Sequence, residues 1–260
     1  MVASDLNVKI LLVRMPMPLN KETPDLGGAL KIVPPRMIYA VQNFSDRIGR
    51  LGGKKPSFVI IGTGRCGTNF VSEYLTRAGC YCGHEEYFRP SGPRFFQGRL
   101  QVSPRGDSSW MAVPFLPDRD ILAIHQTRAP LEVIKSFLKL GFFHERHYER
   151  HKRYVDFARM HFNFSDDPLT SAIRWWIEWN EKCMEITPMH FQIEKFQEST
   201  DRISEWLGLE SGLPKVQVAK DTNSKKVIVS DFDFEVEVGI RASHDYGRLE
   251  HVAGKLGYKL

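Results

Sequence analysis

The sequence lacks long apolar runs and is poor in cysteine. No window of the 260-residue chain approaches the roughly 18 apolar residues that a membrane-spanning helix needs, so we expect no integral membrane segment. Four cysteines are few for this length, and no basic segment followed by an apolar core opens the chain, which favours a cytoplasmic protein with reduced thiols. A net charge of only +5 does not indicate nucleic-acid binding, although it suits an anionic small molecule. Hydrophobic residues make up 42%, enough for one large α/β domain.

A glycine-rich turn between an apolar run and a helix-compatible segment is the strongest local signal. The run Phe58–Ile61 favours a buried strand, Gly62, Gly64 and Gly67 follow it, and residues 68–78 have helical spacing. Glycines at this density let successive backbone N–H groups turn inward at the positive end of the next helix, which predicts an anion-binding loop. The spacing matches a Walker-type loop, but Thr and Asn stand where a nucleotide hydrolase has Lys and then Ser or Thr. Such a loop is poorly equipped for metal-assisted phosphoryl transfer.

The loop resembles the 5′-phosphosulfate loop of sulfotransferases, whose pattern is a basic residue, Ser, Gly, Thr and Thr. Here the pattern reads Arg65-Cys66-Gly67-Thr68-Asn69. The resemblance implies that Gly64 and these five residues bind the 5′-phosphosulfate of 3′-phosphoadenosine 5′-phosphosulfate (PAPS). Because Cys66 and Asn69 depart from the pattern, the usual hydroxyl contacts are missing there, while the backbone of the loop keeps its role.

A second strand, turn and helix pattern lies at residues 120–137. Arg128 ends the predicted strand, Pro130 suits a first helical turn, and Ser136 lies one turn beyond Glu132 on the same helix face. Arg128 and Ser136 can therefore converge. Sulfotransferases bind the 3′-phosphate of their donor with an arginine and a serine eight residues later, and this segment is similar in its spacing.

Three neighbouring residues, His84, Glu85 and Glu86, are candidates for a general base. In the sulfotransferase arrangement the short strand before them emerges beside the donor sulfate, and bacterial carbohydrate sulfotransferases of the trehalose type carry a glutamate before an aromatic pair. A carboxylate there can take the proton of an acceptor hydroxyl as it attacks sulfur. Arg65 would stabilise the charge on the departing phosphate, and its pKa is too high for it to donate a proton. We prefer Glu86, which precedes Tyr87-Phe88, then Glu85, with His84 as the rival.

Four other patterns each leave two interpretations open. The Cys80-x-Cys82-x-His84 spacing offers three metal ligands but lacks the loop of a zinc knuckle, so we expect reduced thiols and no metal. The charged segment 144–154 indicates a solvated helix or a basic lid over an anionic ligand. The tryptophans at 175, 176 and 179 indicate core or a platform for a sugar. The Pro-, Gly- and Ser-rich segment 89–119 favours loop or short helix, and such loops often line the acceptor pocket.

Three further features concern the second half of the chain. Ser165-Asp166-Asp167-Pro168 predicts a helix start, because a capping side chain and an early proline stand together. Glu194 follows a predicted strand at 187–193 and is assigned a structural role. By the same resemblance, Lys225 and Lys226 would close over the 3′-phosphate of the donor.

These patterns together predict a three-layer α/β fold of the P-loop sulfotransferase type, with a mainly parallel central sheet flanked by helices. Residues 1–56 would form an extension packed on a core domain of residues 57–260. The resemblance implies transfer of a sulfuryl group from PAPS, without a metal, to an acceptor hydroxyl of a carbohydrate or glycolipid. The alternatives are a P-loop kinase or nucleotide hydrolase, which needs magnesium and an acidic residue at a strand end, and a non-catalytic nucleotide-binding module. No sequence feature indicates an oligomeric state.

Overall fold

The computed structural model describes residues 55–93, 105–117, 120–145, 148–209, 212–214 and 231–260. Most of the predicted extension of residues 1–56 lies outside these ranges, and the boundary at residue 57 stays a prediction. Within the described ranges no helix is both long and apolar enough to cross a membrane.

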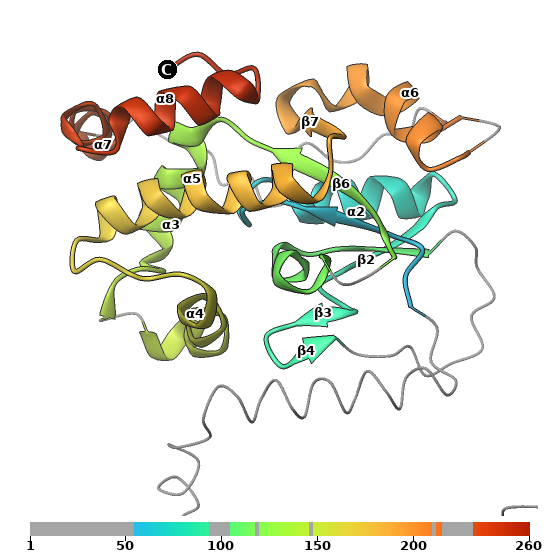
Figure 1. The fold of residues 1–260 in the computed structure, drawn as a ribbon, viewed down its shortest axis with the longest axis horizontal. Helices are drawn as coiled ribbons and strands as arrows, with labels where there is room; N and C mark the ends of the chain where they lie inside the picture. The colour runs from blue at the N-terminus through green and yellow to red at the C-terminus, as the bar shows by residue number, and fades with distance from the viewer. Residues whose placement is uncertain (1–54, 94–104, 118–119, 146–147, 210–211, 215–230) are drawn as a thin grey trace, which may run out of the picture.

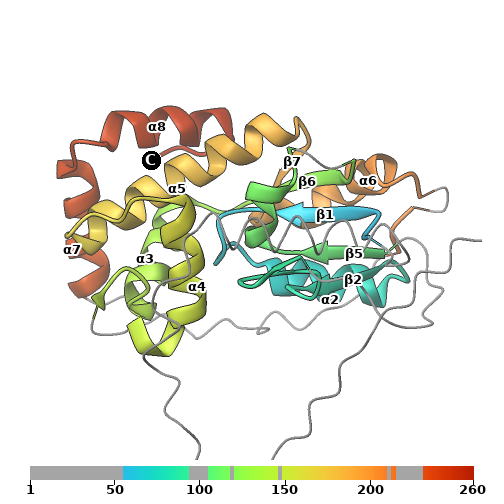
Figure 2. The ribbon, with the colours of Figure 1, turned by 60° about the horizontal axis from the view of Figure 1, so that its bottom comes forward.

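A five-stranded parallel sheet forms the centre of the described structure, with the strand order β2-β5-β1-β6-β7. Figure 2 shows the five strands in this succession. Their bounds are β1 Phe58–Ile61, β2 Tyr81–His84, β5 Arg105–Ser108, β6 Leu122–Thr127 and β7 His190–Gln192. The central strand β1 is buried along its whole length, as its β-branched apolar run predicts. A separate two-stranded hairpin joins β3 Phe88–Arg89 to β4 Gly92–Pro93.

Helices cover both faces of the sheet, and the side chains of β1 show how. Phe58 and Ile60 belong to a core cluster that includes residues of α2 and α6, whereas Val59 and Ile61 belong to a second cluster with residues of α3, α4, α5, α7 and α8. Figure 1 shows these two groups of helices on different sides of the molecule. Their bounds are α2 Thr68–Arg77, α3 Pro130–Leu140, α4 Tyr148–His161, α5 Pro168–Ile186, α6 Phe196–Trp206, α7 Asp231–Ala242 and α8 Tyr246–Lys255. The predicted α/β fold with a mainly parallel sheet between helices is thus confirmed.

The two strand, turn and helix patterns lie where the sequence places them. β1 leads through the glycine-rich loop into α2, and β6 leads through Arg128 and Ala129 into α3, whose first residue is Pro130. The predicted start of α5 is confirmed as well, because the Asp167 carboxylate accepts hydrogen bonds from the backbone N–H groups of Leu169 and Thr170.

The segment 89–119 differs in part from the prediction of loop or short helix. The 3₁₀ helix η2 (Trp110–Phe115) agrees with it, whereas the strand β5, which lies between β1 and β2 inside the central sheet, was not predicted. The sequence of β5, Arg-Gly-Asp-Ser, has no apolar alternation. It is nevertheless buried, because the ring of Phe58 covers Gly106 and the carboxylate of Asp107 is bonded to neighbouring backbone. Long-range contacts therefore override a local composition that is typical of loops.

Two helices add to what the sequence indicated. Residues 148–154 of the charged segment belong to α4, which continues to His161. The helix α7, by contrast, was not predicted.

Candidate functional site

The loop between β1 and α2 has the backbone of an anion-binding nest. Three of its residues have positive φ angles: Gly64 at 74°, Arg65 at 56° and Gly67 at 92°. A Cβ atom at Gly62 would lie 2.5 Å from the carbonyl oxygen of Gln126 on β6, so this position needs glycine. The loop opens at the N-terminus of α2, where Gly67 is the N-cap and no side chain caps the helix. The first N–H groups of α2 are therefore oriented toward a ligand of the loop.

Two buried side chains fix the loop from behind. Trp175 of α5 donates its indole N–H to the carbonyl of Thr63 over 2.8 Å, and the Gln126 side-chain amide donates to the carbonyl of Cys66. With these carbonyls turned inward, the loop N–H groups are left to face outward.

Cys66 stands at the position of the usual serine, but its side chain does not face a ligand. The thiol is fully buried, and a Cβ atom on Gly62 would come within 2.8 Å of its sulfur. Burial raises the pKa of the Cys66 thiol to about 11. Only the backbone of Cys66 is thus available for the predicted phosphosulfate contact.

Arg65, Arg128 and Ser136 come together beside the loop. Arg65 donates from Nε to the Ser136 hydroxyl over 2.9 Å, and Arg128 donates from Nη1 to the Arg65 carbonyl over 3.1 Å. Desolvation and the nearby charge of Arg128 both lower the pKa of Arg65, although an arginine stays charged at neutral pH. The predicted convergence of Arg128 and Ser136 therefore takes place through Arg65. Asn69 lies close by in the first turn of α2 and is half-buried.

The Glu194 carboxylate, together with Tyr258 near the C-terminus, holds the turn that carries Arg128. Glu194 accepts a hydrogen bond of 2.8 Å from the backbone N–H of Ala129 and one of 2.9 Å from the hydroxyl of Tyr258. The Tyr258 hydroxyl also lies 3.1 Å from the hydroxyl of Thr127. These contacts give Glu194 the structural role predicted for it. Tyr258 was missed, because nothing in its local sequence indicates a partner 64 residues away.

At the end of β2 the three candidate bases diverge. His84 lies 3.0 Å from the hydroxyl of Thr68, the first residue of α2, and desolvation lowers the pKa of His84. Glu86 turns back along the strand and accepts a hydrogen bond of 2.7 Å from the hydroxyl of Tyr81. This contact keeps the Glu86 carboxylate at the first residue of β2. The loop follows the last residue of β1, so in this parallel sheet the two lie toward opposite ends of the strands.

Glu85 has the position that best suits a base. Its φ angle of 54° lies in the left-handed region, and the side chains of Tyr154 of α4 and of Trp110 act on its pKa as hydrogen-bonding neighbours that lower it. Trp110 also packs on the loop, since a Cβ atom at Gly64 would lie 3.3 Å from its ring. Desolvation is the main cause that raises the pKa of Glu85, and the charge of Asp107 adds to it. A carboxylate with a raised pKa is a stronger proton acceptor than an ordinary glutamate, which suits a base beside an anion-binding loop.

Asp107 of β5 holds the backbone around the candidate bases. Its carboxylate accepts hydrogen bonds from the N–H groups of Glu86, Tyr87 and Phe88 at 3.0, 3.2 and 2.9 Å, and it is completely buried. These contacts occupy both oxygens of the carboxylate that lies on the strand next to β1. Asp107 is therefore unsuited to the magnesium site that the kinase or hydrolase alternative requires.

The remaining predicted groups lie elsewhere. Trp175, Trp176 and Trp179 have no exposed surface, so the interpretation as a sugar platform is wrong and the core interpretation is confirmed. Cys80 and Cys82 are buried against α2, and among the described residues no group of three His, Cys, Asp or Glu side chains could hold a metal ion. Lys225 and Lys226 lie outside the described residues.

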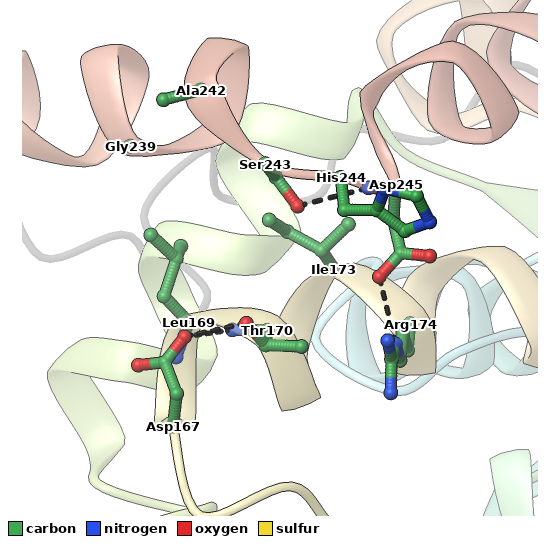
Figure 3. A pocket seen from close by; sticks show the side chains of 10 residues that line it. All are labelled: Asp167, Leu169, Thr170, Ile173, Arg174, Gly239, Ala242, Ser243, His244 and Asp245. Atoms are coloured by element: carbon green, nitrogen blue, oxygen red, sulfur yellow. Dashed lines mark hydrogen bonds and ion pairs between the residues drawn. The ribbon is translucent and has the colours of Figure 1, made fainter.

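A separate cavity of about 350 Å³ lies between α5, α7 and the turn that leads into α8. Figure 3 shows its lining, which includes the ion pair of Arg174 and Asp245 at 2.7 Å. None of the predicted site residues lines this cavity. The loop and its neighbours are therefore the candidate site.

Comparison with known proteins finds a distant similarity to a solved structure and no match in sequence. The structure is similar to a solved structure described as "Sulfotransferase Domain from the Curacin Biosynthetic Pathway", with a TM-score of 0.48 and 14% sequence identity over 80% of this chain and 100% of that chain. No family model matches the sequence, and no curated protein matches it either.

Proposed function

We propose that the protein is a sulfotransferase that moves a sulfuryl group from PAPS to an acceptor hydroxyl. The observation that carries this proposal is the pair of guanidinium groups at the mouth of the nest. Arg65 and Arg128 lie next to each other, and their two positive charges repel. Each charge would also lower the free energy of an anion bound beside it. A ligand with phosphate groups at two places relieves this repulsion. PAPS carries a 5′-phosphosulfate for the loop and a 3′-phosphate for Arg128.

The donor contacts follow from the geometry of the loop. The backbone N–H groups from Gly64 to Asn69 would bind the phosphosulfate oxygens, and the Arg65 guanidinium would lie beside the bridging oxygen. Ser136 would join Arg128 at the 3′-phosphate: its hydroxyl accepts a hydrogen bond from Arg65 and keeps its own proton to donate. Cys66 would contribute its backbone and not its thiol.

Glu85 is the base that this proposal assigns. The acceptor oxygen forms a bond to sulfur, the bond from sulfur to the bridging oxygen breaks, and the acceptor proton passes to the Glu85 carboxylate. The electron pair stays on the departing 5′-phosphate, where Arg65 and the loop N–H groups stabilise the negative charge. Glu86, the first choice from the sequence, is bonded to Tyr81 and would have to leave that contact first. His84 would remain neutral and hold the Thr68 hydroxyl. A carbohydrate or glycolipid acceptor stays part of the proposal.

Calorimetric titration without magnesium tests the donor site. The protein should bind adenosine 3′,5′-bisphosphate, the product of PAPS, more tightly than ATP. Arg128→Ala should weaken bisphosphate binding by about 1.5–3 kcal/mol, the usual contribution of a hydrogen bond to a charged group. A preference for ATP, or unchanged binding by the variant, would refute the assignment.

Arg77→Ala is the matched control. Arg77 is an exposed arginine in the last turn of α2 that pairs with Glu73. It is about 14 Å along the helix from the loop, at 1.5 Å per residue. Its loss removes the same charge from the protein and should leave the affinity for the bisphosphate within about 0.5 kcal/mol of the original value, because exposed charges at this distance are largely screened.

A further inference from the structure

A groove of about 620 Å³ lies at the amino ends of β6 and β7, at the end of the sheet opposite to the glycine-rich loop. Its lining comes from the start of β6, the turn before β7 and the last turns of α6: Leu122, Pro188, Met189, Arg202, Glu205 and Trp206. Leu122 and Trp206 are each 37% exposed. Large apolar side chains that are exposed together in a groove indicate an interaction surface.

Hydrogen bonds hold the α6 side of the groove against the sheet. Trp206 donates its indole N–H to the carbonyl of Ala123 over 3.1 Å, and Arg202 donates from Nη2 to the carbonyl of His190 over 3.2 Å. These bonds engage only the polar ends of the two side chains. The Trp206 ring and the aliphatic part of Arg202 therefore remain available to an apolar partner.

The amino-terminal part of the chain enters the sheet beside this groove. Lys55 donates from Nζ to the carbonyl of Asp120 over 2.8 Å, and the carbonyl of Ser57 accepts a hydrogen bond of 3.4 Å from the backbone N–H of Leu122. β1 and β6 are neighbouring parallel strands, about 4.8 Å apart. The chain that leads to Lys55 thus arrives one strand away from Leu122.

The sequence before this anchor contains an apolar stripe. Its members follow one another at intervals of 4, 3, 4 and 3 residues: Met37, Val41, Phe44, Ile48 and Leu51. This spacing is typical of one face of an amphipathic helix. Gly52 and Gly53 come next and allow the backbone to reverse. The four residues from Leu51 to Lys55 span at most about 14 Å, so the end of the stripe is within reach of the groove.

The charges of the two partners are complementary. Residues 42–55 contain one acidic residue, Asp46, and four basic ones: Arg47, Arg50, Lys54 and Lys55. The helix α6 exposes three carboxylates: Glu198, Asp201 and Glu205. Across the described ranges none of these three forms an ion pair. A basic segment is therefore attracted to this side of the molecule.

We propose that residues 37–51 bind in this groove of the same chain, with the apolar stripe on Leu122 and Trp206 and the basic residues near the carboxylates of α6. The anchor at Lys55 keeps the segment at a high local concentration, so the contact needs little affinity of its own. The groove and the loop lie at opposite ends of the strands, so this inference does not depend on the proposed function.

Cross-linking within the full chain tests the contact. The four native cysteines are buried, so a short bismaleimide reacts first with engineered thiols. Ser45→Cys with Glu205→Cys should give a cross-link within one chain at low protein concentration. Ser45 is ten residues before Lys55, so the anchor alone does not hold it at α6. In the control, Ser45→Cys is combined with Glu250→Cys, on an exposed glutamate of α8 at the other face of the sheet, and about tenfold less cross-link should form.

The other outcomes of the cross-linking contradict the proposal. Cross-links that join two chains would show that a second copy fills the groove. Equal yields with both glutamate positions, or no cross-link with either, would show that the segment does not bind there.

Quenching of tryptophan fluorescence by acrylamide gives an independent measurement. Of the five tryptophans only Trp206 is exposed in the described structure, and the other four are at most 7% exposed, so Trp206 dominates the quenching. Phe44→Ser with Ile48→Ser should roughly double the quenching constant, because the apolar stripe no longer covers the ring. Gln42→Ser with Asp46→Ser changes the opposite side of the helical pattern and should leave the constant unchanged. Equal quenching in the original protein and both variants would overturn the proposal.

Discussion

Replacing Asp107 with asparagine should destabilise the protein strongly, although the two side chains have nearly the same size and shape. The carboxylate accepts three backbone hydrogen bonds in a fully buried place, and the asparagine amide would turn an NH₂ group toward at least one of those N–H donors. Loss of one or two hydrogen bonds to a charged group costs about 1.5–3 kcal/mol each. Asparagine carries no charge, so the variant avoids the free-energy cost of burying the Asp107 carboxylate, the same burial that raises the pKa of Asp107, and this offsets part of the loss. We expect the free energy of unfolding to fall by about 2–4 kcal/mol.

Urea denaturation followed by tryptophan fluorescence measures this change. Asp156→Asn is the control, since Asp156 is an exposed carboxylate bonded to one tyrosine and its loss should cost less than about 1 kcal/mol. A change below about 1 kcal/mol for Asp107→Asn would refute the reasoning that this carboxylate fixes the turn. The same variant should lose most of the activity, because the left-handed conformation of Glu85 is next to the three bonded N–H groups.

Three further predictions concern a close contact, a buried histidine and the base. Gly106→Ala would place a Cβ atom 2.1 Å from the ring of Phe58, so it should lower the free energy of unfolding, measured with urea, by about 1–3 kcal/mol. Gly254→Ala in α8 is the control and should not lower it, because its Cβ atom would meet no atom within 4 Å. Burial lowers the pKa of His125 from 6.5 to about 4, so between these two pH values the unfolded chain binds a proton that the folded protein does not. The free energy of unfolding at pH 6.5 and above should therefore fall by about 3 kcal/mol when the pH is lowered to 4. In thermal or urea unfolding, His125→Gln should show a smaller dependence on pH. Glu85→Gln should reduce kcat at least about 100-fold while bisphosphate affinity stays unchanged, and Glu86→Gln should reduce it less than about tenfold; the reverse order would return the base to Glu86.

The parts of the fold that the sequence predicted are those specified by neighbouring residues. The loop needs three glycines and a helix start, all within ten residues, and the start of α5 needs only Asp167 and Pro168. Such signals act over a few residues and can be recognised without knowing the rest of the chain.

The strand β5 and the choice of base could not be predicted in this way. Burial of Arg-Gly-Asp-Ser depends on Phe58, which lies almost fifty residues earlier, and on backbone groups at 86–88. Glu85 and Glu86 are adjacent and chemically alike, and they differ in their neighbours, which are Tyr81 for Glu86 and Trp110 and Tyr154 for Glu85. Tyr154 belongs to the charged segment 144–154, but its neighbour Glu85 comes from another part of the chain and could not be predicted from the sequence.

The contacts behind the loop bear on the thermodynamics of ligand binding. Because Trp175 and Gln126 hold the carbonyls of Thr63 and Cys66 from elements that are themselves buried, the loop has its binding shape before any ligand arrives. A loop that is already ordered loses little conformational entropy when it closes on an anion, so less of the interaction energy is spent on ordering the protein. Weak anions as small as sulfate should therefore occupy this loop with an affinity close to that of the intact donor's phosphate portion, and the rest of the donor should add affinity nearly independently.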